Sequence, residues 1–181
     1  DAPESIILAG TQDVTLVATS ADVTTETITD STTSGTTTLS LSAVTASTDL
    51  SAVSVDNIEV AGAITAASTL TFAAGAVSTI SSAQTNAFTL DINDGLAAHN
   101  TGAVTVNLDA AVTGAVTVDA AAGGDNINVL NIVANVAQSG LGVVGGTATV
   151  NLSGSANVVM GSSTTAAHLN ASALAGSLTA A

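Results

Sequence analysis

Two stretches of the sequence, Ala103-Val104-Thr105-Val106-Asn107-Leu108 and Thr147-Ala148-Thr149-Val150-Asn151-Leu152, alternate between apolar and polar residues. This period of two places every second side chain on the same face of a β-strand, so one face can be buried while the other meets water. Val and Thr also favour strands. The same alternation occurs in shorter runs at residues 14–17, 36–41, 70–72, 88–92 and 115–118. The sequence therefore predicts an all-β protein.

The spacing of these runs bears on how the strands are arranged. Gly, Asn, Asp and Ser turns separate the strands about every ten residues, and residues 102–106 recur as residues 114–118. A strand-and-turn unit repeated at short spacing predicts a β-solenoid, a stack of coils in which each coil buries its face on the next. A β-sandwich of short antiparallel strands is the alternative. We expect residues 36–181 to form this β-rich, repeat-like domain, and residues 1–35 to be a polar segment that provides edge strands or a linker.

The charged residues are all of one sign. The chain has no Lys or Arg and 14 Asp and Glu, which gives a formal net charge of −14. Nucleic-acid binding depends on Lys and Arg contacts to phosphate, so nucleic acid is excluded as a partner. Phosphoryl transfer is disfavoured for the same reason. Side-chain ion pairs with Lys or Arg cannot form within the chain, and metal ions are the remaining cations, with calcium the first candidate.

No catalytic motif stands out. The chain has no Cys, Trp or Tyr, His99 and His168 are far apart, and no Ser-His-Asp signature is present. Residues 140–145 match the dinucleotide fingerprint G-x-G-x-x-G, but they run into a strand-like segment instead of a helix and are interpreted as a turn. No apolar run is long enough for a membrane helix. We expect a protein that is not an enzyme and has no transmembrane segment.

Two short segments are candidate calcium sites. Asp91, Asn93 and Asp94 place oxygen donors ahead of a glycine turn, although the spacing of an EF-hand loop is absent. Gly123, Asp125 and Asn126 lie in a segment that partly matches the calcium turn G-G-x-G-x-D-x-U-x, in which Gly exposes backbone carbonyls and Asp supplies a carboxylate. The alternative for the second segment is an ordinary turn between strands.

Several segments resemble bacterial surface-layer (S-layer) proteins and their relatives among the repeats-in-toxin (RTX) secreted proteins. The resemblance lies in residues 49–53 followed by 57–60, in the Thr-, Ala-, Val- and Gly-rich strands from 101 to 153, and in residues 169–179. It implies an extracellular, calcium-dependent β-rich protein that self-assembles into a lattice or sheath. The chain departs from the family in having no tandem G-G-x-G-x-D array. We expect it to be a mature or trimmed piece of something larger.

The expected function is therefore that of a structural protein of the cell surface. Its expected partners are copies of itself, calcium ions and, as a further candidate, cell-surface glycan. One alternative is a subunit of an extracellular filament or pilus, in which residues 14–29 complete the sheet of a neighbour. Another alternative is an adhesin or ice-binding ladder built on rows of Thr, although Thr-x-Thr at residues 27–29 and 36–38 does not recur at a constant spacing.

Overall fold

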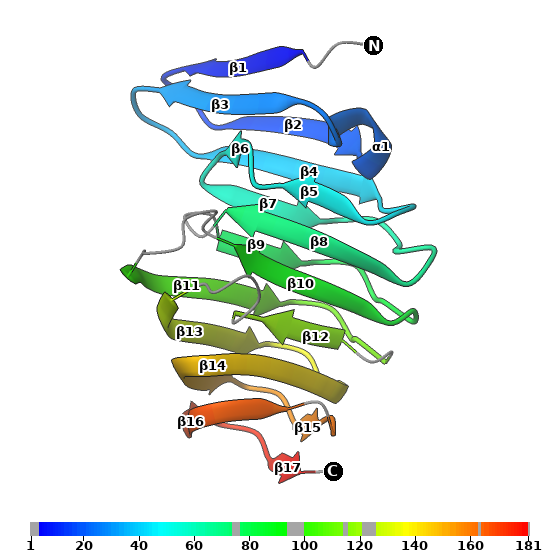
Figure 1. Cartoon of the computed structure of the whole chain (residues 1–181), viewed down its shortest axis with the longest axis vertical. Helices are drawn as coiled ribbons and strands as arrows, with labels where there is room; N and C mark the ends of the chain where they lie inside the picture. The colour runs from blue at the N-terminus through cyan, green and yellow to red at the C-terminus, as the bar shows by residue number, and fades with distance from the viewer. Residues whose placement is uncertain are drawn as a thin grey trace.

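The protein is a β-solenoid of about seven turns, built almost entirely from parallel strands (Figure 1). The computed structural model describes residues 4–73, 77–93, 100–113, 116–120, 126–162 and 164–180. Every pairing between strands in these ranges is parallel, including those of the longest strands. The all-β solenoid predicted from the sequence is thereby confirmed, and the antiparallel sandwich is not the fold.

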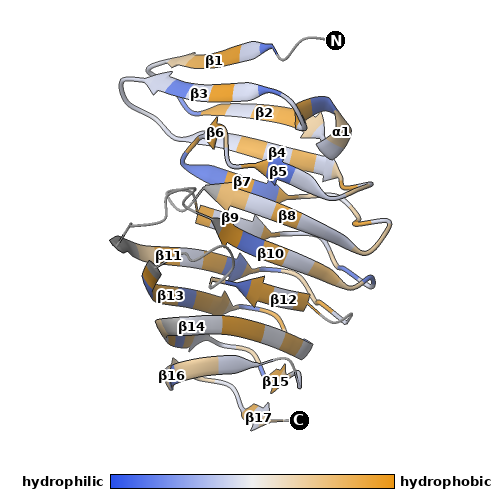
Figure 2. Ribbon diagram, in the orientation of Figure 1, coloured by the Kyte–Doolittle hydropathy of each residue, from blue (hydrophilic) through white to orange (hydrophobic). Residues whose placement is uncertain are grey.

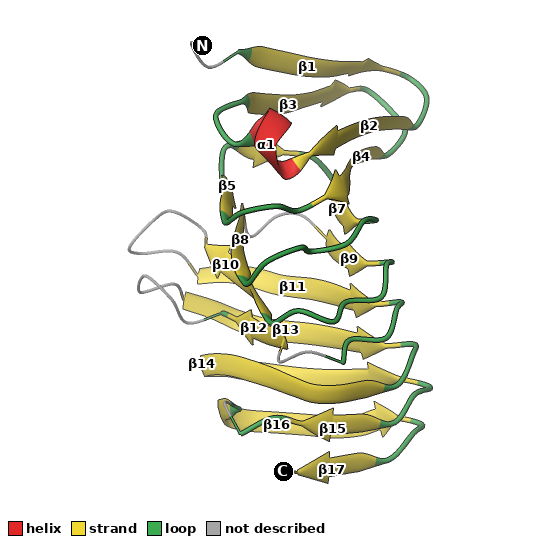
Figure 3. Cartoon of the chain, turned by 90° about the vertical axis from the view of Figure 1, so that its right-hand side faces the viewer, coloured by secondary structure: helices red, strands yellow, loops and turns green. Residues whose placement is uncertain are grey.

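The strands form two columns, called here face A and face B, which are seen from the side in Figure 3. Face A contains β1 (Ser5–Gly10), β3 (Thr27–Thr32), β5 (Thr48–Leu50), β6 (Val53–Ser54), β8 (Ser68–Ala73), β10 (Phe88–Asn93), β12 (Val116–Asp119), β15 (Val158–Met160) and β17 (Leu178–Ala180). Face B contains β2 (Val14–Thr19), β4 (Thr37–Ala43), β7 (Asn57–Val60), β9 (Val77–Ile80), β11 (Asn100–Leu108), β13 (Asn126–Ala134) and β16 (Thr165–Leu174).

One strand belongs to both faces. The first half of β14 (Gln138–Gly154) pairs with β12 and β15, and its second half pairs with β13 and β16. This continuous strand joins the two columns into one sheet of 14 strands, while β1, β3 and β6 form a separate sheet of three strands at the N-terminal end. Residues 5–32 hold β1 and β3 of the smaller sheet and β2, which pairs with β4 of the larger sheet.

The unit of stacking is a full coil rather than the internal repeat of the sequence. Thr71 and Asp91, which lie on adjacent strands β8 and β10, are 20 residues apart. The recurring segments around residues 104–106 and 116–118 instead lie on β11 and β12, which belong to opposite faces. The repeat noticed in the sequence thus relates the two faces and does not measure a coil.

The interior is a set of columns of aliphatic side chains. Alternate residues of each strand point inward, so the apolar and polar colours alternate along the strands in Figure 2. One column on face A consists of Leu70, Leu90, Val118 and Val143. A column on face B consists of Leu39, Ile58, Val106, Ile132 and Leu152, with the buried hydroxyl residue Ser78 between Ile58 and Val106. All of these side chains are buried. Each buried Leu, Ile or Val contributes about 1.5–3 kcal/mol.

Buried glutamines complete the hydrogen bonding at one corner of the stack. Gln84 Oε1 accepts from the backbone N–H of Ile64 at 2.9 Å, and its Nε2 donates to the carbonyls of Gly62 and Ser82 at 3.0 and 2.8 Å. Gln138 repeats this arrangement at a later corner, with its Oε1 accepting from the N–H of Val112 at 3.2 Å. The side-chain amides thus satisfy backbone groups that the turns leave without strand partners.

A short helix lies at the N-terminal end. The helix α1 (Ser20–Val23) follows β2 and buries Val23 in the core. Its first turn is held by Asp22 Oδ2, which accepts from the N–H and hydroxyl of Thr19 at 2.9 and 2.7 Å. These hydrogen bonds lower the pKa of Asp22, the side-chain bond having the larger effect. Among the described residues, no helix has the length and apolar character needed to cross a membrane.

Candidate functional site

The outer surface of face A carries a row of three Asp residues and one Thr. Asp49 on β5 is in register with Thr71 on β8, Thr71 with Asp91 on β10, and Asp91 with Asp119 on β12. We call these four residues the acidic row. Strands in a sheet lie about 4.8 Å apart, so Asp91 and Asp119 are direct neighbours. Their proximity results from the parallel register, which places equivalent positions of successive coils side by side.

Asp91 is a partly buried member of the acidic row. Its Oδ2 accepts a hydrogen bond from the hydroxyl of Thr71 at 3.2 Å, while its Oδ1 is buried and has no hydrogen-bond partner in the described part of the chain. Burial raises the pKa of Asp91, the negative charges of Asp119 and Asp49 raise it further, and the bond from Thr71 opposes this. The site therefore disfavours the ionised carboxylate and would be stabilised by a cation.

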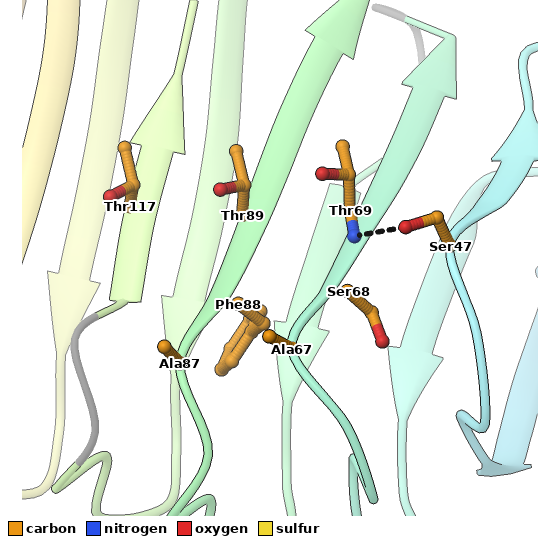
Figure 4. A pocket seen from close by; sticks show the side chains of 8 residues that line it. All are labelled: Ser47, Ala67, Ser68, Thr69, Ala87, Phe88, Thr89 and Thr117. Carbon is orange, nitrogen blue, oxygen red and sulfur yellow. Dashed lines mark hydrogen bonds between the residues drawn. The ribbon is translucent and has the colours of Figure 1, made fainter.

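A row of hydroxyl side chains runs beside the acidic row. Thr69, Thr89 and Thr117 are in register on β8, β10 and β12, and the N–H of Thr69 donates to the hydroxyl of Ser47 at 3.0 Å (Figure 4). These four residues, together with Ala67, Ser68, Ala87 and Phe88, line a shallow groove of about 370 Å³. Face A thus presents parallel rows of hydroxyl and carboxylate groups.

Face B carries acidic and amide groups whose hydrogen bonds are satisfied. Glu59 accepts from the hydroxyls of Ser40 and Ser81 at 3.0 and 2.5 Å. Further along the stack, Asn151 donates to Asn131 Oδ1, and Asn170 donates to Asn151 Oδ1, each at 3.1 Å. This asparagine ladder joins three successive coils. Each Glu59 carboxylate oxygen has a partner, so this residue contrasts with Asp91.

The structure separates the two predicted calcium segments. Asp91 and Asn93 lie on β10 of face A, where the backbone of Asn93 pairs with Ala73. Asn126 is the first residue of β13 on face B and pairs with Asn100. Of the other predicted ligands, Asp94, Gly123 and Asp125 lie outside the described residues. Sequence reasoning identified Asp91 but missed its neighbours in the acidic row.

The described part of the chain contains no group of three or more His, Cys, Asp or Glu side chains placed to hold a metal ion. The acidic row instead offers neighbouring carboxylates and the hydroxyl of Thr71, which are hard oxygen donors of the kind that calcium prefers. A single chain thus supplies only part of a calcium coordination shell here. Water or a second molecule would have to complete it.

The other motifs occupy ordinary positions in the stack. Residues 140–145 lie within strand β14, so the match to the dinucleotide fingerprint is not a strand-to-helix turn. His168 lies on β16 with an exposed side chain and pairs with Thr149, and His99 lies outside the described residues.

Comparisons of the chain with protein-family models, with curated proteins and with solved structures find no match. Any functional assignment therefore depends on the arrangement of the residues themselves.

Proposed function

We propose that this protein is an extracellular structural protein that self-assembles into a lattice or sheath at the cell surface, with calcium ions bridging its carboxylates. The observation that carries the proposal is the acidic row, in which a buried Asp91 oxygen has no partner in the described part of the chain. In a chain with 14 carboxylates and no Lys or Arg, the charge of this row cannot be balanced by basic side chains.

Calcium suits this row because of the number and type of its ligands. Calcium takes six to eight oxygen ligands in a flexible geometry. Asp91, Asp119 and the hydroxyl of Thr71 supply a few of these, and the remaining positions are open to water or to carboxylates of a neighbouring copy. An ion held between two copies would offset repulsion that otherwise opposes assembly at a net charge of −14.

The surface of face A supports a structural role over a catalytic one. The groove beside the acidic row is lined by Ser, Thr, Ala and one Phe, and its lining holds no carboxylate, imidazole or thiol that could serve as an acid, a base or an activated nucleophile. The rows of equivalent side chains repeat from coil to coil, which favours binding to another extended, repetitive surface.

A filament joined by strand addition is the second candidate. It is favoured by the strands at both ends of the described stack, each of which pairs with one other described strand. Within the segment of residues 14–29, β2 already pairs with β4 of its own chain. Under this alternative, β2 would offer its open edge to a neighbour while keeping its place in the stack.

Calcium dependence is the test of the proposed function. Purified protein is examined by electron microscopy, analytical ultracentrifugation and thermal unfolding with calcium and with a chelator. We expect calcium to promote assembly and raise the melting temperature, because it neutralises the acidic row. The variant Asp91→Asn should lose most of this response, whereas Asp109→Asn, which removes the same charge at an exposed turn outside the row, should retain it.

Two results would contradict the proposal. One is an assembly and a melting temperature that a chelator leaves unchanged. The other is an Asp91→Asn variant that responds to calcium as strongly as Asp109→Asn.

A further inference from the structure

Three hydroxyl groups on face A are left free by the fold. Thr69, Thr89 and Thr117, called here the threonine row, occupy half-exposed outward positions in register on β8, β10 and β12. No hydrogen bond joins their hydroxyls to another described residue, and Figure 4 shows the three hydroxyl oxygens on the same side of their side chains. Adjacent strands lie about 4.8 Å apart, which is too far for these hydroxyls to bond to one another. Each hydroxyl therefore keeps its donor and its acceptor positions for water or a ligand.

Neighbouring hydroxyl side chains, in contrast, are used by the protein itself. Ser68 donates to the carbonyl of Ala66 at 2.8 Å, and Thr48 makes the equivalent bond one coil earlier, to Ala46, at 3.1 Å. The hydroxyl of Thr71 donates to Asp91 Oδ2. The threonine row is thus a separate set of hydroxyls, aligned from coil to coil and available on the surface.

The threonine row lines the groove of about 370 Å³ on face A, a volume within the range of ligand sites. Ala67 and Ala87, each directly before its strand, add small exposed apolar groups to the lining, and Phe88 beside them is buried. From Ser47 to Thr117 the groove crosses four successive coils, which span about 14 Å along the stack. Coils stacked on either end would lengthen face A and leave this groove open.

The surroundings of the groove select the kind of ligand. The carboxylates of Asp91 and Asp119 lie on the same outward face, two positions further along their strands than the threonine row, and the chain has no Lys or Arg. An anionic ligand would therefore meet negative charge with no basic partner. A peptide strand has no edge to join, because the backbones of β8, β10 and β12 pair with one another here. An uncharged ligand rich in hydroxyl groups fits these conditions.

We propose that the groove binds an extended, uncharged polysaccharide that lies along the stack. Sugar hydroxyls can donate to and accept from the threonine row, while the C–H faces of the rings can contact Ala67 and Ala87. A chain of equatorially linked hexoses is straight enough to follow hydroxyls that are aligned across several coils, whereas an axially linked chain curls away from them. Successive sugar units would bind successive coils, so weak contacts would add along the chain.

This site is separate from the acidic row and does not need calcium, so it goes beyond the proposed lattice and gives the protein a second kind of ligand. It is tested on the full chain by isothermal titration calorimetry in the presence of a chelator. The extended, uncharged probes are cellohexaose, mannohexaose and chitohexaose. Maltohexaose is the curled control, and the hexamer of mannuronate is the anionic counterpart of mannohexaose.

We expect at least one of the extended, uncharged probes to bind and both control sugars to fail. Binding should shift the NMR signals of the threonine row, which locates the ligand. Thr89→Val and Thr117→Val remove one hydroxyl each and keep a branched side chain that favours strands. Each should weaken binding about two- to twelvefold, the effect of one hydrogen bond, and the double variant should weaken it further.

The matched control is Thr149→Val, which removes a half-exposed hydroxyl from an outward position on face B and should bind like the original protein. Circular dichroism and the melting temperature confirm that each variant is folded.

Three results would overturn the inference: no binding of any extended, uncharged probe at millimolar concentration, binding of maltohexaose as tight as that of the extended probes, or a double variant with the affinity of Thr149→Val. These results leave the calcium-dependent assembly untouched, since that is decided by chelation and Asp91→Asn. Conversely, failure of assembly in calcium would not alter binding measured in chelator.

Discussion

Replacing Gln84 with leucine removes a side chain that holds two coils together at a corner. Gln84 is 1% exposed, and its amide bonds to three backbone groups: the N–H of Ile64 and the carbonyls of Gly62 and Ser82. Leucine occupies a similar volume and can form none of these bonds. The substitution therefore leaves three backbone groups without a partner in the folded state.

The size of the effect follows from the burial of these groups. A buried polar group that loses its partner costs about 1–3 kcal/mol. The bond to the N–H of Ile64 is buried, whereas the two carbonyls are bonded in partly buried surroundings and can be reached more easily by water. After allowing for the apolar gain of leucine, we expect the free energy of unfolding to fall by about 2–4 kcal/mol, a large share of the stability of a typical domain.

Urea denaturation followed by circular dichroism measures this change, since the chain has no Trp or Tyr for fluorescence. Hydrogen exchange at the amide of Ile64 gives a local measurement, because that N–H should exchange faster in Gln84→Leu. The control is Gln12→Leu, where the exposed amide bonds only to the neighbouring carbonyl of Thr11. An unchanged denaturation midpoint together with an Ile64 amide that stays slow to exchange would refute the reasoning.

Three further substitutions test other parts of the structure. The pKa of Asp91 lies above its ordinary value of 3.8, so the folded state binds a proton at this carboxylate more tightly than the unfolded state does. Without calcium, the original protein should therefore gain stability as the pH falls from 7 through that raised pKa towards 3.8. Thermal unfolding measured against pH should show a smaller gain in Asp91→Asn. Asn151→Ala removes both bonds in the middle of the asparagine ladder and should lower the free energy of unfolding by about 1 kcal/mol in urea denaturation. Gly62→Ala would place a methyl group 1.7 Å from the carbonyl oxygen of Ser42, so the backbone at this corner must shift. The free energy of unfolding should fall by about 1–3 kcal/mol, and the melting temperature should fall with it. The control Ala61→Ser, at an exposed position, should have little effect.

The strands themselves could be predicted because their alternation directly reflects a buried and an exposed face. Val104, Val106 and Leu108 are buried on β11 as the pattern at residues 103–108 requires, and Val150 and Leu152 are buried on β14. This alternation is enough to predict the strands of a parallel solenoid, since each inward position only has to hold an aliphatic side chain of moderate size.

The stacking of the strands could not be predicted, because the length of a coil varies. Ser40 on β4 and Glu59 on β7, which are hydrogen bonded, are 19 residues apart. Thr79 on β9 and Asn107 on β11, which are also hydrogen bonded, are 28 residues apart. A fixed repeat is therefore absent from the sequence even though the structure is regular. The segments between strands differ in length, while the pairings of β7 with β9 and of β9 with β11 keep an unbroken register.

Because the number of residues per coil varies, most of the candidate site could not be predicted from the sequence. Asp91 could be identified from its local run of oxygen donors, but Asp49 and Asp119 become its neighbours only through the register of β5, β8, β10 and β12. Both rows could have been predicted by aligning three short runs in which a Thr is followed two positions later by Thr or Asp. These runs are residues 69–71, 89–91 and 117–119. Their unequal spacing conceals this alignment when the sequence is read alone.

The two ends of the chain lie at opposite ends of the stack (Figure 1), and this has a mechanical consequence. Hydrogen bonds between coils run along the long axis, so tension along that axis is carried by every coil in series, and coils separate from the ends at which the pull is applied. A coil of about 20 residues that peels away adds roughly 70 Å of extended chain. The molecule would therefore yield to a pull in small steps, lengthening coil by coil, and would act as an extensible element instead of a brittle rod.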